Sequence, residues 1–420
     1  MTVANADPRS NYAPVDAECG GLEVEIEVDG RLPAGLAGTY VRNGPNRAAS
    51  QGVGGLWFDG QGMVHALRID GGRATYSNRW VRTPSLDELV PAFGRAAEPA
   101  SAGLADVGVD GLLALSDSGR PWRVDPATLE TVGPDVVDAP GVSMVLPHVT
   151  RVDGRPVTVG TSWDDPTLTF LERGDDGHWR PTGEYVAERR PFLHDVRVVD
   201  GRVVTLDLPW CRRERGVGWD PEAGAAIVLA ERVGAGAVVA DVTPAYVSHL
   251  ASAWAEGPTV HIVGCRRRVP GIAAGEDNPF EDTPGSLRRW SIDTRNGRVA
   301  EADVDDHPCD FPSLLPDGRR VVVTRPTGSN YTVARGVSAI DMTTGASQDH
   351  DFGPGRFGGE MISLGEVDGQ ALVAGFVHDA SRDAAELLVL DADDLAGRPV
   401  ATLRVPVRVP YGLHGAWLPA

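Results

Sequence analysis

The stretch VRVVDGRVVTLDL (196–208) indicates the fold class of this chain. Two runs rich in valine, a residue that favours strands, flank the pair Asp200-Gly201. An Asp-Gly pair suits a two-residue hairpin loop, because both central residues of that turn adopt positive φ. The stretch therefore predicts a β-hairpin from its own residues.

The same combination of turn and strand recurs along nearly the whole chain. Further Asp-Gly or Asn-Gly pairs occur at 29–30, 59–60, 70–71, 110–111, 153–154, 176–177, 296–297, 317–318 and 368–369. Short β-rich runs lie between them, for example RPVTVGTSW (155–163), TVHIVGC (259–265), RRVVVTRP (319–326) and QALVAGFVHD (370–379). Many short strands with regular turns are typical of a sandwich, a barrel or a propeller.

Length separates these three architectures. The chain has 420 residues, and its 51 glycines and 32 prolines are spread along it without marking a linker. This is too long for one sandwich but fits about six to eight four-stranded blades. We therefore predict an all-β fold, a single β-propeller domain over residues 1–420, in which residues 1–35 form an N-terminal extension leading into the first blade. A propeller closes by pairing its two ends, which would give the C-terminal segment VPYGLHGAWLPA (409–420) a partner strand.

One stretch has helical periodicity. In TPSLDELVPAFGR (83–95), Leu86, Leu89, Val90 and Phe93 would share one face of a helix. This helix either packs on the body of the propeller or forms an apolar lip through which an apolar substrate enters. We expect it among loops and short helices that cap one face of the propeller.

Charge and cysteine content limit the partners and the compartment. The net charge is −20, and all 39 basic residues are arginine, so nucleic acid is not an expected partner. The four cysteines are far apart and form no C-x-x-C pair, which predicts reduced thiols in a cytoplasmic protein. The N-terminus has no signal-peptide pattern, and no apolar run reaches the length of a membrane span. A location peripheral to a membrane, with transient contact at its surface, stays open, and so does the oligomeric state.

Four of the ten histidines share a distinctive context. The full set is His65, His148, His178, His194, His249, His261, His307, His350, His378 and His414. Those at 148, 194, 249 and 414 lie at the edges of predicted strands, beside proline, glycine or another small or turn-forming residue. Inner strand ends of different blades converge on a propeller axis, where four imidazoles would bind a borderline metal such as Fe, Zn, Cu or Ni. The alternative is that each is an ordinary core or surface histidine.

Seven segments resemble a known family in chain order. They are GTYVRNGPN (38–46), WFDGQGMVHALRIDGGRATYSNRWVRT (57–83), LLALSDSGRPWRVDPATLETVG (112–133), FLHDVRVV (192–199), LRRWSID (287–293), DFPSLLPDGR (310–319) and PYGLHGAW (410–417). Together they resemble the carotenoid cleavage oxygenase family, which includes carotenoid and apocarotenoid oxygenases, lignostilbene dioxygenases and the retinal-pigment-epithelium isomerase. The resemblance implies a seven-bladed β-propeller with loops and short helices capping one face. It also implies an Fe(2+) ion on the axis, held by His148, His194, His249 and His414.

The resemblance also implies three carboxylates behind these histidines. Asp117, Asp310 and Glu360 match the positions that accept the outer N–H groups of His194, His249 and His414 respectively. The family normally has glutamate at the first two positions, and aspartate is shorter by one C–C bond, roughly 1.5 Å. Losing such a contact typically costs about 10–100-fold in metal affinity or activity. Either a water bridges the shorter aspartates to the imidazoles or the backbone lies further inward, and iron occupancy or rate is the property that this departure would affect.

The implied function is that of a non-haem Fe(II) dioxygenase. It would cleave a carbon–carbon double bond of a carotenoid or apocarotenoid polyene with O2, give two carbonyl products and need no organic cofactor. Stilbenoid or phenylpropanoid cleavage is an alternative, which the absence of lysine disfavours, because stilbene-cleaving members are thought to hold a phenol with a lysine. A catalytically impaired propeller that acts as a binding protein is a second alternative, and a calcium-dependent propeller hydrolase a third. Phe58, Trp80 and Phe93 are candidates for lining the substrate tunnel and would pack equally well as core.

Overall fold

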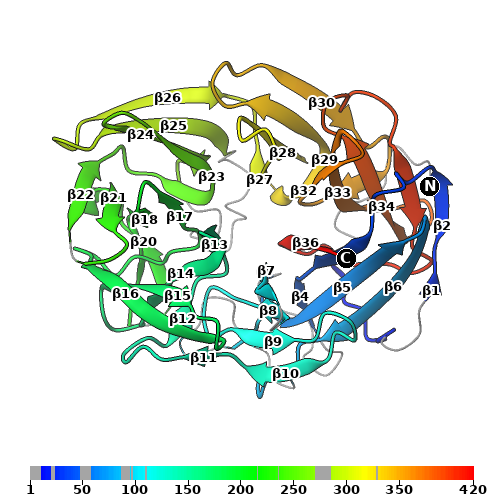
Figure 1. The fold of residues 1–420 in the computed structure, drawn as a ribbon, viewed down its shortest axis with the longest axis horizontal. Coiled ribbons are helices and arrows are strands. Elements are labelled where there is room, and N and C mark those ends of the chain that lie inside the picture. The colour runs from blue at the N-terminus through cyan, green and yellow to red at the C-terminus, as the bar shows by residue number, and fades with distance from the viewer. Residues whose placement is uncertain are drawn as a thin grey trace.

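A computed structural model describes residues 11–19, 24–47, 58–86, 95, 98–108, 111–214, 216–234, 236–269, 285–327 and 330–420. Across these ranges the regular structure is almost entirely β-strand, and the helical part is limited to short 3-10 turns such as Pro221–Ala223. The strands form a ring of sheets around a central axis (Figure 1). The all-β prediction is therefore confirmed. Most of the helix predicted at 83–95 lies outside the described residues.

The strands group into twisted antiparallel blades, numbered here in chain order. Blade 1 contains β1 (Val24–Glu25), β3 (Gly38–Arg42), β4 (Pro45–Asn46), β5 (Gln61–Asp70), β6 (Arg73–Trp80) and β36 (Gly415–Pro419). Blade 2 contains β7 (Leu104–Asp106), β8 (Leu112–Ala114), β9 (Trp122–Val124) and β10 (Thr131–Pro134). Blade 3 contains β11 (Val136–Val137), β12 (Met144–Val145), β13 (Thr150–Val152), β14 (Arg155–Thr161), β15 (Thr167–Arg173) and β16 (His178–Val186).

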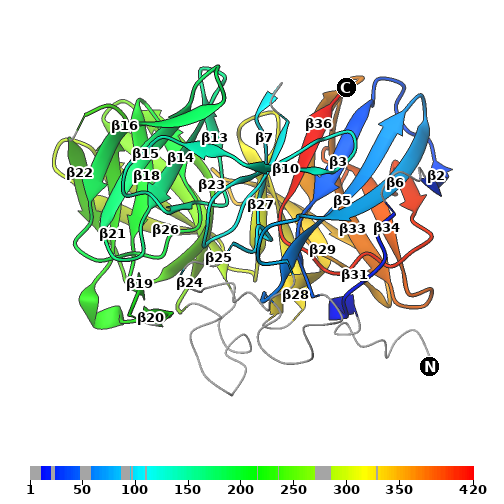
Figure 2. The same cartoon turned by 90° about the horizontal axis from the view of Figure 1, so that it is seen from below.

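Blades 4 and 5 follow the same plan. Blade 4 contains β17 (Arg197–Val199), β18 (Arg202–Asp207), β21 (Ala226–Glu231) and β22 (Ala237–Asp241), and the small sheet of β19 (Trp210–Arg212) and β20 (Val217–Trp219) is inserted between its strands. Blade 5 contains β23 (Tyr246–Glu256), β24 (Thr259–Arg267), β25 (Ser286–Asp293) and β26 (Val299–Asp305). Figure 2 shows β19 and β20 at one end of the propeller axis and the C-terminus at the other.

The last two blades are linked into one ten-stranded sheet. Blade 6 contains β27 (Asp310–Leu314), β28 (Arg320–Thr327), β29 (Asn330–Asp341) and β30 (Ser347–Asp351). Blade 7 contains β32 (Ile362–Val367), β33 (Gln370–Asp379), β34 (Ala384–Asp391), β35 (Ala401–Arg404) and β2 (Glu27–Gly30). The short strand β31 (Arg356–Gly358) joins them by pairing with both β29 and β33. This division is consistent with the predicted seven blades.

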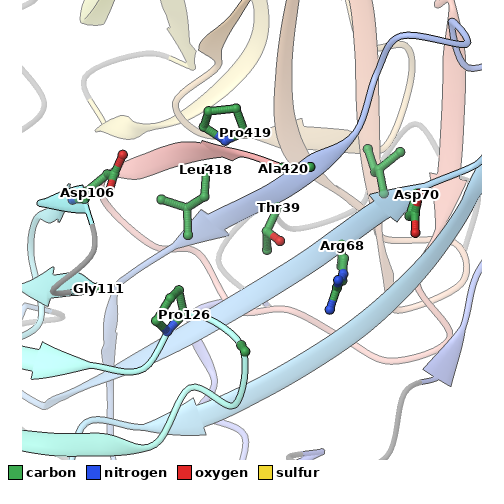
Figure 3. A pocket seen from close by; sticks show the side chains of 13 residues that line it. Thr39, Arg68, Asp70, Asp106, Gly111, Pro126, Leu418, Pro419 and Ala420 are labelled. Carbon is green, nitrogen blue, oxygen red and sulfur yellow. Dashed lines mark hydrogen bonds between the residues drawn. The ribbon is translucent and has the colours of Figure 1, made fainter.

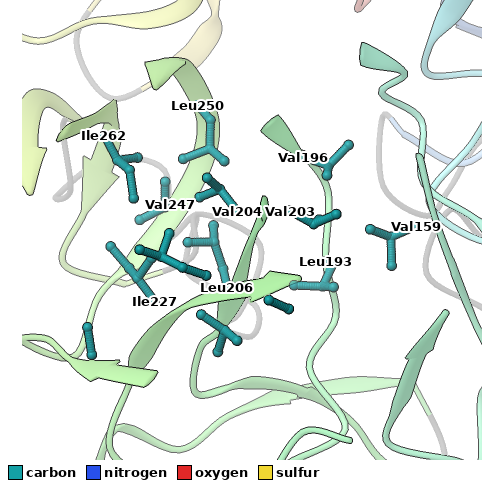
Figure 4. Packing of buried hydrophobic residues seen from close by; sticks show 14 of the residues in the cluster. Val159, Leu193, Val196, Val203, Val204, Leu206, Ile227, Val247, Leu250 and Ile262 are labelled. Carbon is teal, nitrogen blue, oxygen red and sulfur yellow. The ribbon is translucent and has the colours of Figure 1, made fainter. Parts of the chain in front are cut away.

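Apolar contacts between neighbouring blades run all the way round the ring. One buried cluster joins blades 3, 4 and 5, and Figure 4 shows its members Val159, Leu206 and Ile262. Five further clusters join blades 1 with 2, 2 with 3, 5 with 6, 6 with 7, and 7 with 1. Each sheet is thus buried on both faces, and the core is distributed between blades rather than gathered at the axis.

The two ends of the chain close the ring, as predicted for the terminal segment. The strand β36 pairs antiparallel with β3, which places Trp417 opposite Tyr40. The predicted N-terminal extension also contributes strands, because β1 pairs with β6 and β2 pairs with β35. The described part of residues 1–35 is therefore built into blades 1 and 7.

The predicted two-residue loop occurs at three of the Asp-Gly pairs. Asp153-Gly154, Asp200-Gly201 and Asp368-Gly369 each connect paired strands as two-residue loops, and both residues of each pair have positive φ. The prediction is wrong at the other described pairs. Asp176-Gly177, Asn296-Gly297 and Asp317-Gly318 lie in longer loops, and Asp70 still pairs with Arg73, so that the loop there is Gly71-Gly72. Gly30 is paired in a strand with Ala401, and Asp59-Gly60 only leads into β5. An Asp-Gly pair fixes a local backbone bend, but distant pairing decides whether the bend becomes a hairpin.

Candidate metal centre

Four histidines that are far apart in the chain meet at the propeller axis. His148 and His194 precede the inner strands β13 and β17, His249 lies in β23, and His414 directly precedes β36. The Nε2 atom of His194 lies 3.2 Å from that of His148, 3.1 Å from that of His249 and 3.3 Å from that of His414. The Nε2 atoms of His249 and His414 are 3.2 Å apart. These are the four histidines selected from the sequence.

The local backbone explains how two of these side chains reach the axis. The strand β23 changes register against β24 between Val247 and Leu250, and such a bulge redirects side chains. His414 is held by the amide of Asn43, which donates to the His414 carbonyl at 2.9 Å. Glycine is required nearby because a Cβ at Gly412 would lie 2.7 Å from the Asn43 carbonyl oxygen and 2.5 Å from Arg42 Nε.

Three carboxylates face the outer nitrogens of three of these imidazoles. Asp117 Oδ1 lies 2.5 Å from His194 Nδ1, and Asp310 Oδ1 lies 2.6 Å from His249 Nδ1. Glu360 Oε1 lies 3.1 Å from His414 Nδ1, and its other oxygen accepts the Gly415 amide at 2.7 Å. The three pairs are those expected from the sequence. The four histidines and three carboxylates come one from each of the seven blades.

The two aspartates do not leave the gap that their shorter side chains suggested. Both make direct contacts that are shorter than the contact of Glu360. Asp310 begins β27 and also accepts hydrogen bonds from Ser248 Oγ at 3.0 Å and from Arg267 Nη2 at 2.7 Å. Of the two alternatives, the structure therefore has the second: the backbone of blades 2 and 6 brings these carboxylates within direct reach of His194 and His249.

The donor set fits a metal ion. A ring Nδ1 that donates to a carboxylate leaves Nε2 unprotonated with its lone pair exposed, and three such Nε2 atoms here lie within 3.3 Å of each other. Lone pairs at this distance repel one another unless a cation lies between them. A metal–nitrogen bond of about 2.1 Å with ligand angles of about 90–109° sets neighbouring nitrogens about 3.0–3.4 Å apart. The observed distances match this range.

The electrostatic environment differs between the imidazoles. Burial outweighs Asp310 and lowers the pKa of His249, whereas at His194 the effect of burial is outweighed by the charge and hydrogen bond of Asp117, which raise its pKa above the ordinary value. Burial lowers the pKa of His148 well below its ordinary value, and the neighbouring imidazoles and Arg197 lower it further. Burial alone would raise the pKa of Asp310, but His249, Arg267 and their hydrogen bonds hold it well below its usual range. The site therefore presents nitrogen lone pairs surrounded by fixed negative charge, which is the arrangement that binds a divalent cation.

A small cavity of about 30 Å³ opens over the histidines, enough for about two water-sized molecules. Its lining combines aromatic and apolar residues with polar ones: Phe58, Phe192, Tyr246, Phe311 and Leu413 on the one hand, and Asp117, Ser248, His194, His249 and His414 on the other. Of the three tunnel candidates, Phe58 lies here. Trp80 is a buried residue of β6 that does not belong to this lining, and Phe93 lies outside the described residues.

A larger cavity of about 550 Å³ lies elsewhere, between blades 1 and 2 and next to the C-terminal residues of the chain (Figure 3). Thr39, Arg68, Asp106 and Leu418 line it, and its lining contains neither a histidine nor an aromatic side chain. This cavity therefore has no group suited to stacking on a conjugated substrate or to holding a soft metal. The candidate site for metal binding is therefore the group of four histidines.

A propeller whose axis carries convergent imidazoles backed by carboxylates belongs to the metal-dependent enzymes, and comparisons with known proteins agree. A family model described as retinal pigment epithelial membrane protein matches residues 12–419. A carotenoid cleavage oxygenase from Mycobacterium tuberculosis is 28% identical over 504 aligned positions that cover 100% of both chains. The structure of a cobalt-substituted apocarotenoid oxygenase from Synechocystis has a TM-score of 0.83 at 25% identity and covers 98% of both chains.

A fourth comparison concerns the fold alone. The lignostilbene dioxygenase of Pseudomonas brassicacearum has a TM-score of 0.85 at 21% identity over 100% of both chains. Because the family model spans nearly the whole sequence, the assignment is direct. The chain belongs to the carotenoid cleavage oxygenase family. The family model that matches it is the one described as retinal pigment epithelial membrane protein, and the metal of this family is iron.

Sequence reasoning missed several groups around the site. Ser248 and Arg267 both bind Asp310, and Asp195 is a buried carboxylate whose Oδ1 lies 3.9 Å from His148 Nδ1. Asp195 and Ser248 each adjoin a predicted ligand histidine in sequence, which was an available signal. Arg267 lies at the end of β24, and only the pairing of β23 with β24 brings it to the site.

Proposed function

We propose that this protein is an Fe(2+)-dependent dioxygenase that cleaves a carbon–carbon double bond of a carotenoid or apocarotenoid with O2. The supporting observation is the convergence of His148, His194, His249 and His414, three of them with Nδ1 held by a carboxylate. We propose these four side chains as the iron ligands. The names of the relatives from Mycobacterium tuberculosis and Synechocystis agree with this substrate class.

Iron(II) bound at the four nitrogens would supply the O2 chemistry. The protein's own residues have three tasks around it. Asp117, Asp310 and Glu360 keep each Nδ1 protonated, so that Nε2 faces the axis as an acceptor. Phe58, Phe192 and the other apolar lining residues exclude water and favour an apolar chain over a polar one.

The reaction balances without an organic cofactor. Cleavage of the double bond to two carbonyl groups oxidises each carbon by two electrons, and these four electrons reduce one O2, whose atoms end in the two products. An electron-rich polyene therefore serves as both substrate and reductant.

The decisive experiment combines metal analysis with a substrate panel. We expect the wild-type protein, purified or reconstituted with Fe(2+), to contain about one iron per chain and to convert an apocarotenal into two carbonyl fragments in the presence of O2. His194→Ala and His414→Ala should lose iron and turnover but keep the β-rich circular dichroism spectrum. His178→Ala is the matched control, because this half-exposed histidine pairs with Asp138 on the surface.

Other outcomes would change the assignment. Preferential turnover of a hydroxystilbene would identify a stilbenoid-cleaving enzyme. A wild-type protein that cannot be reconstituted with iron would instead be a binding protein. Full iron content and turnover in His194→Ala would refute the ligand assignment.

We also propose that the enzyme takes its substrate from a membrane surface by transient contact. The support is the poor aqueous solubility of a polyene. Within the described ranges no helix is long and apolar enough to cross a bilayer. Faster turnover of an apocarotenal in phosphatidylcholine vesicles than in detergent, with co-sedimentation of the protein, would support this. Equal rates without co-sedimentation would contradict it.

A further inference from the structure

Both backbone groups of Leu250 are held by side chains of the neighbouring blade. Asp195 Oδ2 accepts the Leu250 amide at 2.8 Å, and Arg197 Nη2 donates to the Leu250 carbonyl. Arg197 Nη1 also donates to Asp195 Oδ1 at 2.7 Å. We call this arrangement of Asp195 and Arg197 around Leu250 the Asp195–Arg197 clamp.

The clamp joins the two strands that carry His194 and His249. Asp195 directly follows His194 in blade 4, and Leu250 directly follows His249 in blade 5. The strand β23 changes register on both sides of Leu250, so its ladder to β24 is interrupted next to His249. The clamp therefore supplies a positional constraint that regular strand pairing does not supply there.

The carboxylate of the clamp also faces the remaining histidine. Asp195 Oδ1 lies 3.9 Å from His148 Nδ1, too far for a direct hydrogen bond. His148 differs from the other three histidines because no carboxylate hydrogen bond to its Nδ1 occurs among the described residues. Among the described residues, Asp195 is the carboxylate that lies within 4 Å of a nitrogen of this ring.

The surroundings of the clamp are apolar. Leu193, Val196 and Leu250 are buried in the cluster between blades 3, 4 and 5 (Figure 4), and Asp195 is 2% exposed. A charged hydrogen-bond network in such surroundings is strong when every member is satisfied, and it is sensitive to the loss of one acceptor. Asp195 accepts from the amides of Val196 and Leu250 and from Arg197.

We propose that Asp195 is a positioning residue that sets the spacing of His148, His194 and His249 around the metal. It acts through the backbone of Leu250 on His249, through its own backbone on His194, and through its charge on His148. This inference rests on the proposed function in one respect, namely that the four histidines bind a metal.

The test uses Co(2+) titration of the full-length apoprotein, because the visible bands of Co(2+) report the number and arrangement of its ligands. Asp195→Asn keeps the shape but places an NH2 group against one of the donors from Leu250, Val196 or Arg197. We expect this variant to bind Co(2+) about 10–100-fold more weakly than wild type, with shifted visible bands. Asp200→Asn is the matched control, because this exposed residue lies in the same hairpin and its pairing is with Arg202 at the surface. It should leave both readouts unchanged.

The outcomes separate this inference from the metal centre itself. Wild-type protein that binds no Co(2+) would overturn the metal centre and the inference with it. Asp195→Asn that keeps wild-type affinity and spectrum while losing thermal stability would show a structural role only, and would overturn the inference alone. If Asp195→Asn does not fold, Arg197→Lys replaces it, because it keeps the charge but cannot bridge Asp195 and Leu250 with two nitrogens. A wild-type Co(2+) spectrum and affinity in that variant would likewise overturn the positioning role.

Discussion

Replacing Asp310 by asparagine tests the most buried charge beside the metal centre. Asp310 is 0% exposed and binds His249 Nδ1 through Oδ1 and Arg267 Nη2 through Oδ2. An amide oxygen can still accept from His249, but the NH2 group then faces the guanidinium of Arg267, which is also buried. The substitution therefore breaks a buried ion pair and keeps the side-chain shape.

Two magnitudes follow for Asp310→Asn. Breaking a buried ion pair by removing one charge costs about 3–5 kcal/mol. The unfolding entropy of about 2.1 cal/mol/K per residue gives about 0.9 kcal/mol/K for this chain, so the apparent Tm should fall by about 3–6 °C. Loss of the carboxylate behind His249 should also weaken metal binding about 10–100-fold.

Differential scanning fluorimetry of apoprotein and a competitive Co(2+) titration would measure the two effects separately. Asp303→Asn is the control, because it removes one charge from an exposed pair with Arg288 in the neighbouring blade 5. Exposed pairs contribute less than about 1 kcal/mol, so this variant should melt within about 1 °C of wild type. Asp310→Asn with wild-type Tm and wild-type Co(2+) affinity would refute the role assigned to the carboxylate.

Three further variants test other parts of the structure. Asp117→Glu should lower iron retention, because the aspartate already lies 2.5 Å from His194 Nδ1 and an added methylene must displace the ring; equal or higher iron content would contradict this. Gly103→Ala should lower both Tm and Co(2+) affinity, because its Cβ would lie 1.9 Å from the carbonyl oxygen of Pro147, next to His148; two unchanged values would contradict it. His65→Gln should reduce the fall in the free energy of unfolding that occurs as the pH is lowered. Burial holds the pKa of His65 well below its ordinary value, and Arg42 and Arg408 lower it further. Below about pH 6.5 this histidine is therefore protonated in the unfolded chain but not in the folded protein. The free energy of unfolding of the wild type then falls by up to about 1.4 kcal/mol per pH unit. Melting curves from pH 5 to 7 with equal slopes in both proteins would refute this.

The candidate site could be predicted in part because its residues lie in recognisable local sequence. His148, His194, His249 and His414 precede or begin inner strands, and strand edges are visible from turn residues and β-rich runs. Burial alone would not have selected them. His65 and His378, at 3% and 2% exposed, are as buried as His249 and His414 and more buried than His148 and His194, but they lie within β5 and β33. Their distance from the axis depends on how the blades pack, and this cannot be inferred from a local sequence pattern.

The sequence by itself determined the all-β class and the positions of several hairpins, because positive φ at Asp-Gly and alternation along strands are properties of a few adjacent residues. It also singled out the four histidines by their place at strand edges, and the resemblance to the family then implied that they are metal ligands. Only the tertiary structure decided that Asp117 and Asp310 reach the imidazoles directly, that Asp195 and Arg197 hold Leu250, and which Asp-Gly pairs are hairpins. These outcomes depend on the relative positions of different blades to within about an ångström. Packing between residues distant in the chain sets those positions, and local sequence does not encode them.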